Sequence, residues 1–394
     1  MSKQDVLVRK SPHNDKRYNK RYNKNKDYHH KHRKSKKKRI ILICVLCLVG
    51  VLAVLIGYAA SILINSDKYD SRTMFNPKEN NIVAGAAGDR ADANAGGPDI
   101  GENAVLYNGE VYQYNQDMVN VVFMGIDYEK HEGAEGETLG GGQADTILLI
   151  AINTNNNKMT LFNIPRDTMT EIKLYDLNRN YAGNTVAQIA LSHAYGDGAE
   201  LSNQLTVDAV SNLFYGLPIY RYITLDVAGI PAATDAVGGV TVTPPETVEV
   251  AGKTVEKGTP VTLDGKQAQS YVKQRDESEL TSNLSRMDRQ VSYLKGFFNA
   301  VKENTKNNVL FPVSLYQEIG SYASTDMSLS EIAYVARAAL DSGLADENIM
   351  TVPGEMQQGE VYAEYIADDE ELYQMILDTF YLKQPSAATA GTAE

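Results

Sequence analysis

Charged residues stand at the ends of apolar segments in this chain, where they could act on a ligand. Asp127 follows one apolar run, Asp145 precedes the next, and Arg166 follows a third. Folds commonly carry binding and catalytic groups in the loops at such points. Two carboxylates, in a region with no cysteine and little histidine, favour a hard cation, most naturally Mg²⁺. The arginine favours a phosphate-bearing ligand, because its planar guanidinium grips phosphate at two points.

A second group of polar residues lies at the junction of two predicted helices. Lys273 and Arg275 close the first helix, and Arg286, Arg289 and Gln290 open the second. Arg286 and Gln290 share one helix face through their i, i+4 spacing. Carboxylates, a metal and several guanidinium groups together are typical of a phosphoryl-transfer or pyrophosphate site. From spacing alone, each residue could equally be a turn aspartate or half of a surface ion pair.

Other kinds of catalytic site lack their motifs in this chain. The sequence after residue 64 contains no GxSxG, HExxH, GxxxxGKS or GxGxxG pattern. His131 and His193 are the only histidines in that region, and neither has a partner at metal or triad spacing. His193 lies in an otherwise apolar stretch, which favours a core or rim histidine with its hydrogen bonds satisfied.

Hydrophobic periodicity predicts alternating strands and helices beyond residue 115. The predicted strands are Met118–Met124, Thr146–Ile152, Met159–Ile164, Tyr220–Leu225, Val240–Val242 and Ile349–Val352, with a hairpin over Val248–Leu263. The predicted helices are Thr185–Ala194, Leu201–Tyr215, Asp264–Gln274 with Asp264 as its cap, Leu284–Glu303, one capped by Ser328, and Asp368–Tyr381. This alternation indicates an α/β or α+β domain with a mixed sheet.

The run Ile40–Ile64 predicts a membrane-spanning helix. Its 25 residues carry no charge and no proline, and at 1.5 Å per residue they can cross a hydrocarbon core of about 30 Å. Residues 1–39 carry 16 Lys or Arg against three Asp, whereas the remainder carries 22 against 47. Because the positive flank stays inside, we expect a single span in the cell membrane with a cytoplasmic tail and an extracellular domain.

The same composition limits the partners and the domain boundaries. The basic run Lys31–Arg39 beside a span indicates attraction to anionic membrane lipids and no nucleic acid. Cys44 and Cys47, the only cysteines, lie in the span, so the exterior domain can form no disulfide. Residues 65–115, rich in Asn, Gly, Ala and Asp, predict a flexible spacer. We expect the folded domain over residues 116–383 and a disordered tail over 384–394.

Six ordered pieces of the sequence together resemble the LytR-CpsA-Psr family. They are VVFMGID, GGQADTILLIAIN, MTLFNIPRDT, YITLDVAGIPAATDAVGGVTV, YVKQRDE and LSRMDRQ, and they follow one another in the order of that family. The resemblance covers roughly residues 116–382. It implies an α-β-α arrangement around a mixed central β-sheet, with a long hydrophobic tunnel for a polyprenyl chain. The apolar stretches Val186–Leu191 and Val210–Phe214 could line such a tunnel or could equally be core.

The resemblance also implies roles for the two aspartates and for two of the arginines. Asp127 and Asp145 match the two aspartates that the family associates with Mg²⁺, and Asp145 is also assigned to the chemical step. Arg166 matches the pyrophosphate-binding arginine after the third strand and is assigned to catalysis as well as to substrate binding. Arg289, within the R-x-x-R-Q motif, is assigned to substrate binding.

The later basic cluster matches the family with departures. Arg275, Arg286 and Gln290 correspond to substrate-binding residues, and the two arginines are assigned to catalysis as well. Gln143 stands where many members have arginine two residues before the second aspartate, and Lys273 stands where they have the first arginine of an R-x-R motif. We assign both to substrate binding. One guanidinium is thus lost and another becomes a point charge, which affects pyrophosphate binding or the polymer that is handled.

The function implied is that of a phosphotransferase, a ligase of the bacterial cell envelope. Its donor would be a glycopolymer such as a teichoic acid or capsule precursor on polyprenyl pyrophosphate, and its acceptor peptidoglycan. Two alternatives remain open: a pyrophosphatase that acts on the lipid-linked intermediate, and a non-catalytic envelope-binding or regulatory module with a decayed site.

Overall fold

A computed structural model of the protein describes residues 57–71, 103–127, 141–176, 178–274, 282–360 and 362–385. The chain divides into two compact units, Met1–Ser61 and Ile62–Glu394. Of the first unit, only residues 57–61 are described, and all of them are helical. The second unit contains all the labelled strands and helices described below.

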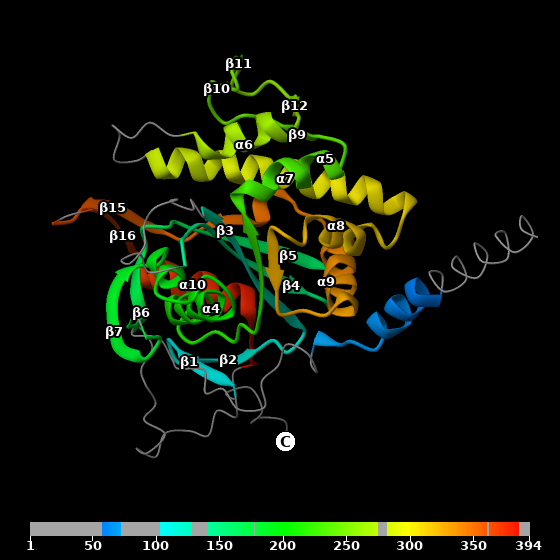
Figure 1. Ribbon diagram of the computed structural model, residues 1–394. Helices are drawn as coiled ribbons and strands as arrows, with labels where there is room; N and C mark the ends of the chain where they lie inside the picture. Colours follow the sequence, from blue (N-terminus) through cyan, green and yellow to red (C-terminus); the bar gives the residue numbers. More distant parts are fainter. Residues whose placement is uncertain are drawn as a thin grey trace, which may run out of the picture. The chain divides into compact units, whose positions relative to one another are not determined.

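A six-stranded mixed sheet forms the centre of this unit (Figure 1). Its strands in spatial order are β13 (Ala323–Thr325), β8 (Arg221–Asp226), β3 (Met118–Asp127), β4 (Gln143–Asn153), β5 (Lys158–Ile164) and β14 (Ile349–Thr351). The β8–β3 and β5–β14 pairs are parallel, and the other neighbours are antiparallel. The predicted mixed sheet is therefore confirmed, and the strands expected for β3, β4, β5, β8 and β14 all belong to it.

Helices cover both faces of this sheet because its strands are apolar on both sides. Helices α4 (Glu200–Leu213) and α10 (Asp369–Phe380) pack on the face that includes Phe162 and Leu149. Helices α7 (Ser282–Asn307), α8 (Phe311–Ile319) and α9 (Leu329–Ser342) pack on the opposite face, which includes Val121 and Ile152. Figure 1 shows α4 and α10 apart from α8 and α9, with the sheet between the two sets. The predicted helices at α4, α7, α9 and α10 are confirmed, and Ser328 caps α9.

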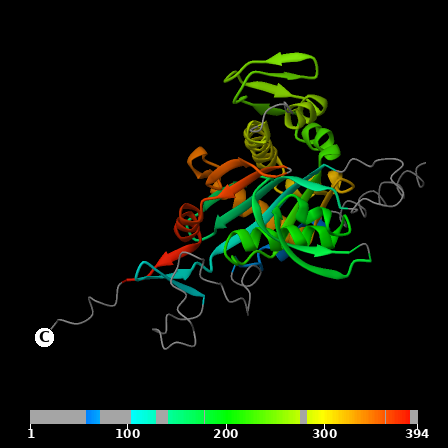
Figure 2. The same ribbon diagram turned by 90° about the vertical axis from the view of Figure 1, so that its left-hand side faces the viewer.

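A smaller lobe stands beyond one end of the sheet (Figures 1 and 2). It comprises the short helix η1 (Val227–Gly229), α5 (Ile230–Ala236), β9 (Val240–Val242), β10 (Val248–Val250), β11 (Lys253–Val255), β12 (Val261–Leu263) and α6 (Gly265–Lys273). Asp264 caps α6 through a capping box with Gln267, as its sequence predicts. Helix α7 packs tightly on the lobe, since a Cβ at Gly296 would lie 2.2 Å from the carbonyl oxygen of Thr241. The expected hairpin exists only as β10–β11, and β12 pairs with β9 instead.

The remaining elements flank the central sheet. They are β1 (Ala104–Tyr107), β2 (Glu110–Tyr114), β6 (Met169–Tyr175), β7 (Tyr181–Gln188), α3 (Leu191–Ala194), η2 (Asp346–Asn348), β15 (Gly354–Gln358), β16 (Ala363–Ala367) and β17 (Tyr381–Lys383). The helix predicted over 185–194 is wrong. Thr185–Gln188 belongs to strand β7, which pairs with β6 in an antiparallel hairpin, and only Leu191–Ala194 is helical. This pairing is a tertiary contact that overrides local helical periodicity.

Folded structure also begins earlier than the predicted boundary at residue 116. Strands β1 and β2, inside the expected spacer, form a three-stranded sheet with β17 near the other end of the chain. At the start of the same expected spacer, Asp67 forms an ion pair with Arg337 of α9, and the rings of Tyr69 and Tyr334 lie 6.4 Å apart. Parts of this segment are therefore held by the domain.

The predicted span is described only in part. Residues 40–56 of it, like the basic tail, lie outside the described residues. In the parts of the chain that the structure covers, no helix has both the length and the apolar character needed to cross a membrane. Ile62, which the sequence places in the span, is 6% exposed and belongs to the cluster that contains Val119 and Ile332. Its burial there places this residue of the predicted span against the domain, although Ile64 is 62% exposed.

Candidate active site

The central sheet brings three chain segments to one edge. Strand β3 ends at Asp127, directly opposite Gln143, where the antiparallel strand β4 begins. Strand β5 runs antiparallel to β4 and ends with Ile164 opposite Ile147, so that Arg166 follows at the same edge. The residues that flank apolar runs in the sequence therefore meet in space, as predicted.

A β-bulge directs Asp145 into the site. The register of β3 and β4 pairs Gly125 with Thr146 and Ile126 with Ala144, which leaves Asp145 as an extra residue on β4. Ala144 and Ile147 both belong to the core on the α4 and α10 side, while Asp145 and Thr146 between them both line a pocket on the other side. Strict alternation would place only one of two consecutive side chains there. The bulge thus aims the carboxylate, a common use of bulges beside active sites.

Arg166 is fixed by three neighbours. Its Nη1 donates to Oδ1 of Asp145, and its Nη2 donates to Oε1 of Gln143. Its Nε lies 3.6 Å from Oδ1 of Asp167. The side chain is only 15% exposed, so this guanidinium has little freedom to turn. Gln143, which replaces an arginine of the family pattern, therefore acts here as an acceptor that orients Arg166.

Asp167 is a site component that the sequence analysis did not single out. Its side chain is 5% exposed. It accepts hydrogen bonds from Nδ2 of Asn283 at 2.6 Å and from Nε2 of Gln188 at 3.2 Å. These contacts hold the carboxylate behind Arg166 and tie the end of β5 to the start of α7. Its place beside Arg166 in the IPRDT segment was the one available signal.

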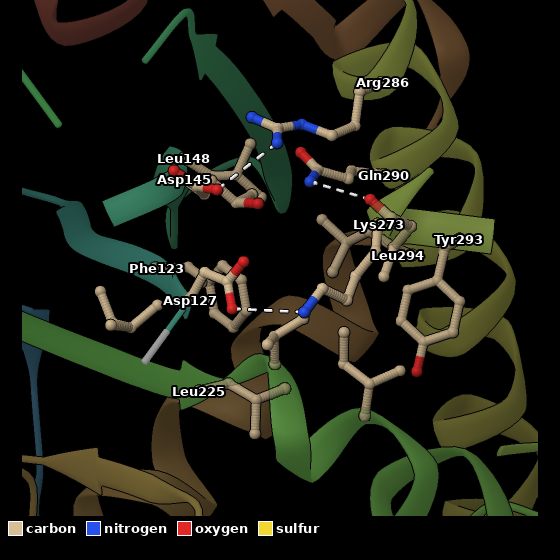
Figure 3. A pocket seen from close by; sticks show the side chains of 16 residues that line it. Phe123, Asp127, Asp145, Leu148, Leu225, Lys273, Arg286, Gln290, Tyr293 and Leu294 are labelled. Atoms are coloured by element: carbon tan, nitrogen blue, oxygen red, sulfur yellow. Dashed lines mark hydrogen bonds and ion pairs between the residues drawn. The ribbon is translucent and has the colours of Figure 1, made fainter. Parts of the chain in front are cut away.

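Helices α6 and α7 supply the opposing cations. Nη1 of Arg286 lies 3.4 Å from Oδ2 of Asp145, and Nζ of Lys273 lies 3.4 Å from Oδ1 of Asp127. Figure 3 shows Arg286 reaching from α7 toward Asp145, and Lys273 reaching toward Asp127. Each carboxylate therefore has a cation from the helical side. Arg275, also assigned to the site, lies outside the described residues.

The two other residues of the later cluster differ in their placement. Gln290 lines the same pocket as Arg286, and its Nε2 donates to the carbonyl oxygen of Val272 at 3.4 Å. Arg289 does not line that pocket. It is 3% exposed, and its guanidinium contacts Glu246 and the backbone of the segment that follows α6. The assignment of Arg289 to direct substrate contact is therefore wrong, because its donors face the protein interior.

Five of these residues, Asp127, Asp145, Lys273, Arg286 and Gln290, line a cavity that we call the charged pocket. Arg166 lines a smaller neighbouring cavity, which shares Asp145, Arg286 and Gln290 with the charged pocket. The charged pocket has an empty volume of about 680 Å³ and combines charged or polar side chains with an apolar floor. Its lining includes Asp127, Asp145, Lys273, Arg286, Gln290, Phe123, Leu148, Leu225, Tyr293 and Leu294, as Figure 3 shows. A cavity with apolar walls and a few convergent polar groups is the usual form of a ligand site.

A second cavity, which we call the apolar groove, adjoins the charged pocket. It has an empty volume of about 1340 Å³ between the sheet and helices α7, α8 and α9, with almost entirely apolar walls. Phe123, Leu225 and Leu294 line both cavities. Two alternatives, tunnel wall and core, are open from the sequence for Val186–Leu191 and Val210–Phe214, and neither stretch lines the apolar groove. Val210–Phe214 packs in the core on the other face of the sheet, and Val186 is 63% exposed on β7.

The pair Asp127 and Asp145 is compatible with a hard divalent cation. Within the described ranges, no group of three or more His, Cys, Asp or Glu residues is placed to hold a metal. Mg²⁺, however, commonly binds through one or two carboxylates and completes its shell with water and substrate phosphates. Both carboxylates line the charged pocket. They could therefore hold Mg²⁺ together with an anionic ligand.

His193 is a satisfied core histidine, as its apolar surroundings predict. Its side chain is buried, with Nδ1 3.2 Å from the carbonyl oxygen of Gly142 and Nε2 3.1 Å from Oδ1 of Asn203. Burial lowers the pKa of His193, although its hydrogen bonds act in the opposite direction. The residue anchors the segment that leads into β4 and does not line the charged pocket.

Comparison with known proteins agrees with this architecture. The LytR_cpsA_psr family model matches residues 91–379. A polyisoprenyl-teichoic acid–peptidoglycan teichoic acid transferase, TagU of Oceanobacillus iheyensis, is 28% identical over 65% of this chain and 73% of the relative. TagU of Enterococcus faecalis is 29% identical over 66% of this chain and 77% of the relative.

Two solved structures share the fold. TagV of Bacillus subtilis superposes with a TM-score of 0.52 at 20% identity, over 67% of this chain and 98% of that one. A protein of Streptococcus agalactiae superposes with a TM-score of 0.53 at 20% identity, over 68% of this chain and 91% of that one. Because the family model spans most of the sequence, from before β1 to α10, the chain belongs to the LytR-CpsA-Psr family.

Proposed function

We propose that this protein is a phosphotransferase that moves a glycopolymer from a polyprenyl pyrophosphate carrier to peptidoglycan during cell wall assembly. The observation that carries the proposal is the continuity of the charged pocket with the apolar groove through Phe123, Leu225 and Leu294. A ligand that fits both has an anionic head and a long apolar tail. The names of the relatives, which are teichoic acid transferases, support a polymer of this kind.

The reaction follows from the groups at the sheet edge. Arg166 and Arg286 would grip the pyrophosphate oxygens, with Lys273 and Arg275 adding positive charge. A peptidoglycan hydroxyl attacks the phosphorus that carries the sugar and forms a new P–O bond. The bond from that phosphorus to the bridging oxygen breaks, and polyprenyl phosphate leaves. Catalysis here consists of positioning and charge stabilisation, as in phosphoryl transfer generally.

The two aspartates have a separate part in the proposal. Asp127 and Asp145 are the residues that would hold Mg²⁺, which would neutralise charge on the phosphate oxygens when bound. Asp145 is also the candidate to accept the hydroxyl proton. Its bulge and its contacts with Arg166 and Arg286 keep its carboxylate at the centre of the charged groups.

The proposal includes a place for the protein in the cell. The charge asymmetry and the run Ile40–Ile64 support a single-pass anchor in the cell membrane, with the tail in the cytoplasm and the domain outside. Such an anchor would keep the apolar groove near a carrier lipid that resides in the same bilayer. Membrane lipids would then be permanent neighbours of the chain.

The test is a transfer assay with the full chain in lipid vesicles. Its substrates are polyprenyl pyrophosphate-linked teichoic acid and peptidoglycan, and the product measured is polymer covalently attached to the acceptor. We expect Arg166→Ala to lower the transfer rate about 10²–10³-fold, the usual cost of removing a group that stabilises transition-state charge. Lys306→Ala, an exposed change at the far end of α7, is the matched control and should transfer normally.

Two results would count against the proposal. Transfer by Arg166→Ala at the control rate would remove that residue from the site. Free polymer phosphate released at the same rate with and without peptidoglycan would instead identify a pyrophosphatase.

A further inference from the structure

The end of helix α6 is held by side chains from α7. The last carbonyl groups of a helix have no partner within it and must find donors elsewhere. In α6, the carbonyl oxygen of Tyr271 accepts a hydrogen bond from Nε of Arg289 at 3.2 Å, and that of Val272 accepts one from Nε2 of Gln290 at 3.4 Å. Nη2 of Arg289 donates to the carbonyl oxygen of Gln274, just past the helix. Two consecutive residues of α7 thus bond three carbonyls of one short segment.

Arg289 is fully engaged in this role. Its Nη1 donates to Oε1 of Glu246, on the loop between β9 and β10. Each of its three nitrogens therefore has a protein acceptor, and its side chain is only 4% exposed. Because this guanidinium is buried and does not line the charged pocket, it is not available to a substrate. Its planar fork instead fixes the relative positions of α6, α7 and the small lobe.

The segment that Arg289 holds carries residues of the proposed pyrophosphate site. Lys273 lies between Val272 and Gln274, whose carbonyls are both bonded from α7, and its Nζ reaches to 3.4 Å from Asp127. Arg275 follows Gln274 directly in the sequence. Arg286 lies one turn before Arg289 on the same helix and reaches Asp145. Helix α7 therefore contributes one site cation, Arg286, and also holds the segment that carries Lys273.

We propose that Arg289 is a positioning residue: by bonding the carbonyls of Tyr271 and Gln274, it places Lys273 for pyrophosphate binding. The pyrophosphate ligand in this proposal rests on the proposed function, whereas the hydrogen bonds of Arg289 do not. The three residues of the R-x-x-R-Q motif would then have different roles. Arg286 faces the substrate, Arg289 orients the opposing segment, and Gln290 does both.

A purely structural role makes a different prediction. A buried ion pair is often replaceable by apolar groups at little cost in stability, whereas removing one partner leaves an uncompensated charge. If Arg289 only stabilises the fold, its loss lowers the melting temperature and leaves the kinetics of the folded fraction unchanged. If it positions Lys273, its loss changes kinetics at temperatures where the protein is fully folded.

The experiment compares Arg289→Ala, Arg289→Lys, Lys273→Ala and the double variant Arg289→Ala with Lys273→Ala, all in the full chain. Lys306→Ala is the control. We expect Arg289→Ala to lower kcat/KM for the polyprenyl pyrophosphate-linked donor about 10–100-fold, because small misplacements of binding groups have effects of this size. Arg289→Lys should recover part of the loss. The double variant should be little worse than the poorer single variant, since Arg289 acts partly through Lys273.

Amide deuterium exchange over residues 265–274 tests the contacts without any need for activity. Arg289→Ala should speed exchange at the end of α6 while the rest of the chain keeps its protection. Unchanged exchange there, or losses that multiply fully in the double variant, would overturn the proposal. If the wild-type protein transfers no polymer yet Arg289→Ala still frees α6, the proposed function fails and the positioning contact stands. If Arg289→Ala does not fold, Arg289→Lys and Glu246→Gln decide the question by the same exchange measurement.

Discussion

The two faces of the central sheet carry similar aliphatic side chains, but the helices pack closely on one face and leave a groove on the other. On the α4 and α10 side, Phe162, Phe214 and Phe380 form a cluster with ring centroids 5.3–6.5 Å apart, and all three are at most 1% exposed. On the α7, α8 and α9 side, the sheet residues border the apolar groove, with an empty volume of about 1340 Å³. The first face is therefore a fully packed core, and the second borders a groove with apolar walls.

The difference shows that a buried apolar face is not by itself a sign of core. Val122 and Phe162 point into the filled face, whereas their neighbours Val121 and Leu161 line the groove. Empty apolar volume costs stability, because its lining loses dispersion contacts. In the proposed function, this open volume is the place for the apolar tail of the donor.

Removing one aromatic ring from each face should give the largest measurable difference between the two faces, as a difference in the free energy of unfolding. Phe380→Ala on the filled face should lower the free energy of unfolding by about 3–5 kcal/mol, the usual cost of a core phenylalanine. Phe297→Ala, which removes a partly buried ring that lines the groove, should cost about 1–2 kcal/mol, because less packing is lost. Denaturant titration of the full chain in detergent measures both. Equal costs would contradict the distinction between the faces.

Filling the groove should affect the donor and leave the fold nearly intact. Ala336 of α9 lines the groove, and Ala336→Phe would occupy part of the space for a polyprenyl chain. We expect about a tenfold rise in KM for a long-chain donor, equivalent to the loss of about 1.4 kcal/mol of binding, and little change for a short-chain donor. Asp341→Phe, which places the same ring on an exposed position of α9, is the control. A rise in KM that is equal for both chain lengths would argue against the groove as the lipid site.

A smaller effect should come from His193, at the filled side of the molecule. Burial holds the pKa of its imidazole below the ordinary value of 6.5, so the unfolded chain takes up a proton where the folded chain does not. Stability is therefore complete above pH 6.5 and falls as the pH drops from 6.5 through the lowered pKa. The slope is at most about 1.4 kcal/mol per pH unit for one group.

Unfolding curves between pH 7.5 and pH 5 measure this slope, and His193→Gln should reduce it. A variant with the full wild-type slope would assign the pH dependence to other groups.

The sequence contained clear signals for the strands of the central sheet, but not for which strands pair with one another. The runs at β3, β4 and β5 were predictable because each is a short apolar segment between polar turns. Strand β7 was not, since Thr185–Gln188 is held as strand by pairing with β6, and local periodicity does not report that contact. Strands β1 and β2 were missed for a different reason: they form a local hairpin around Asn108-Gly109, inside a segment whose overall composition predicts a spacer. Only their third strand, β17, lies near the other end of the chain.

The candidate site was predictable in its membership more than in its geometry. Asp127, Asp145 and Arg166 meet because they flank strands of one sheet. The bulge at Asp145 and the buried Asp167 depend on register and tertiary packing, which charge patterns do not encode. Arg289 shows the same limit, because an arginine inside a basic motif looks like a substrate ligand until its burial is known.

Whether the charged pocket and the apolar groove form one site is tested most directly by binding affinity. The full chain is titrated with polyprenyl pyrophosphates of increasing length and with the corresponding alcohols. If the charged pocket and the apolar groove bind one ligand, affinity should rise with chain length. It should fall sharply when the pyrophosphate is replaced by hydroxyl, and Arg166→Ala should weaken only the pyrophosphates. Affinity that is independent of chain length, or equal for pyrophosphate and alcohol, would contradict the proposal that the two cavities form one site.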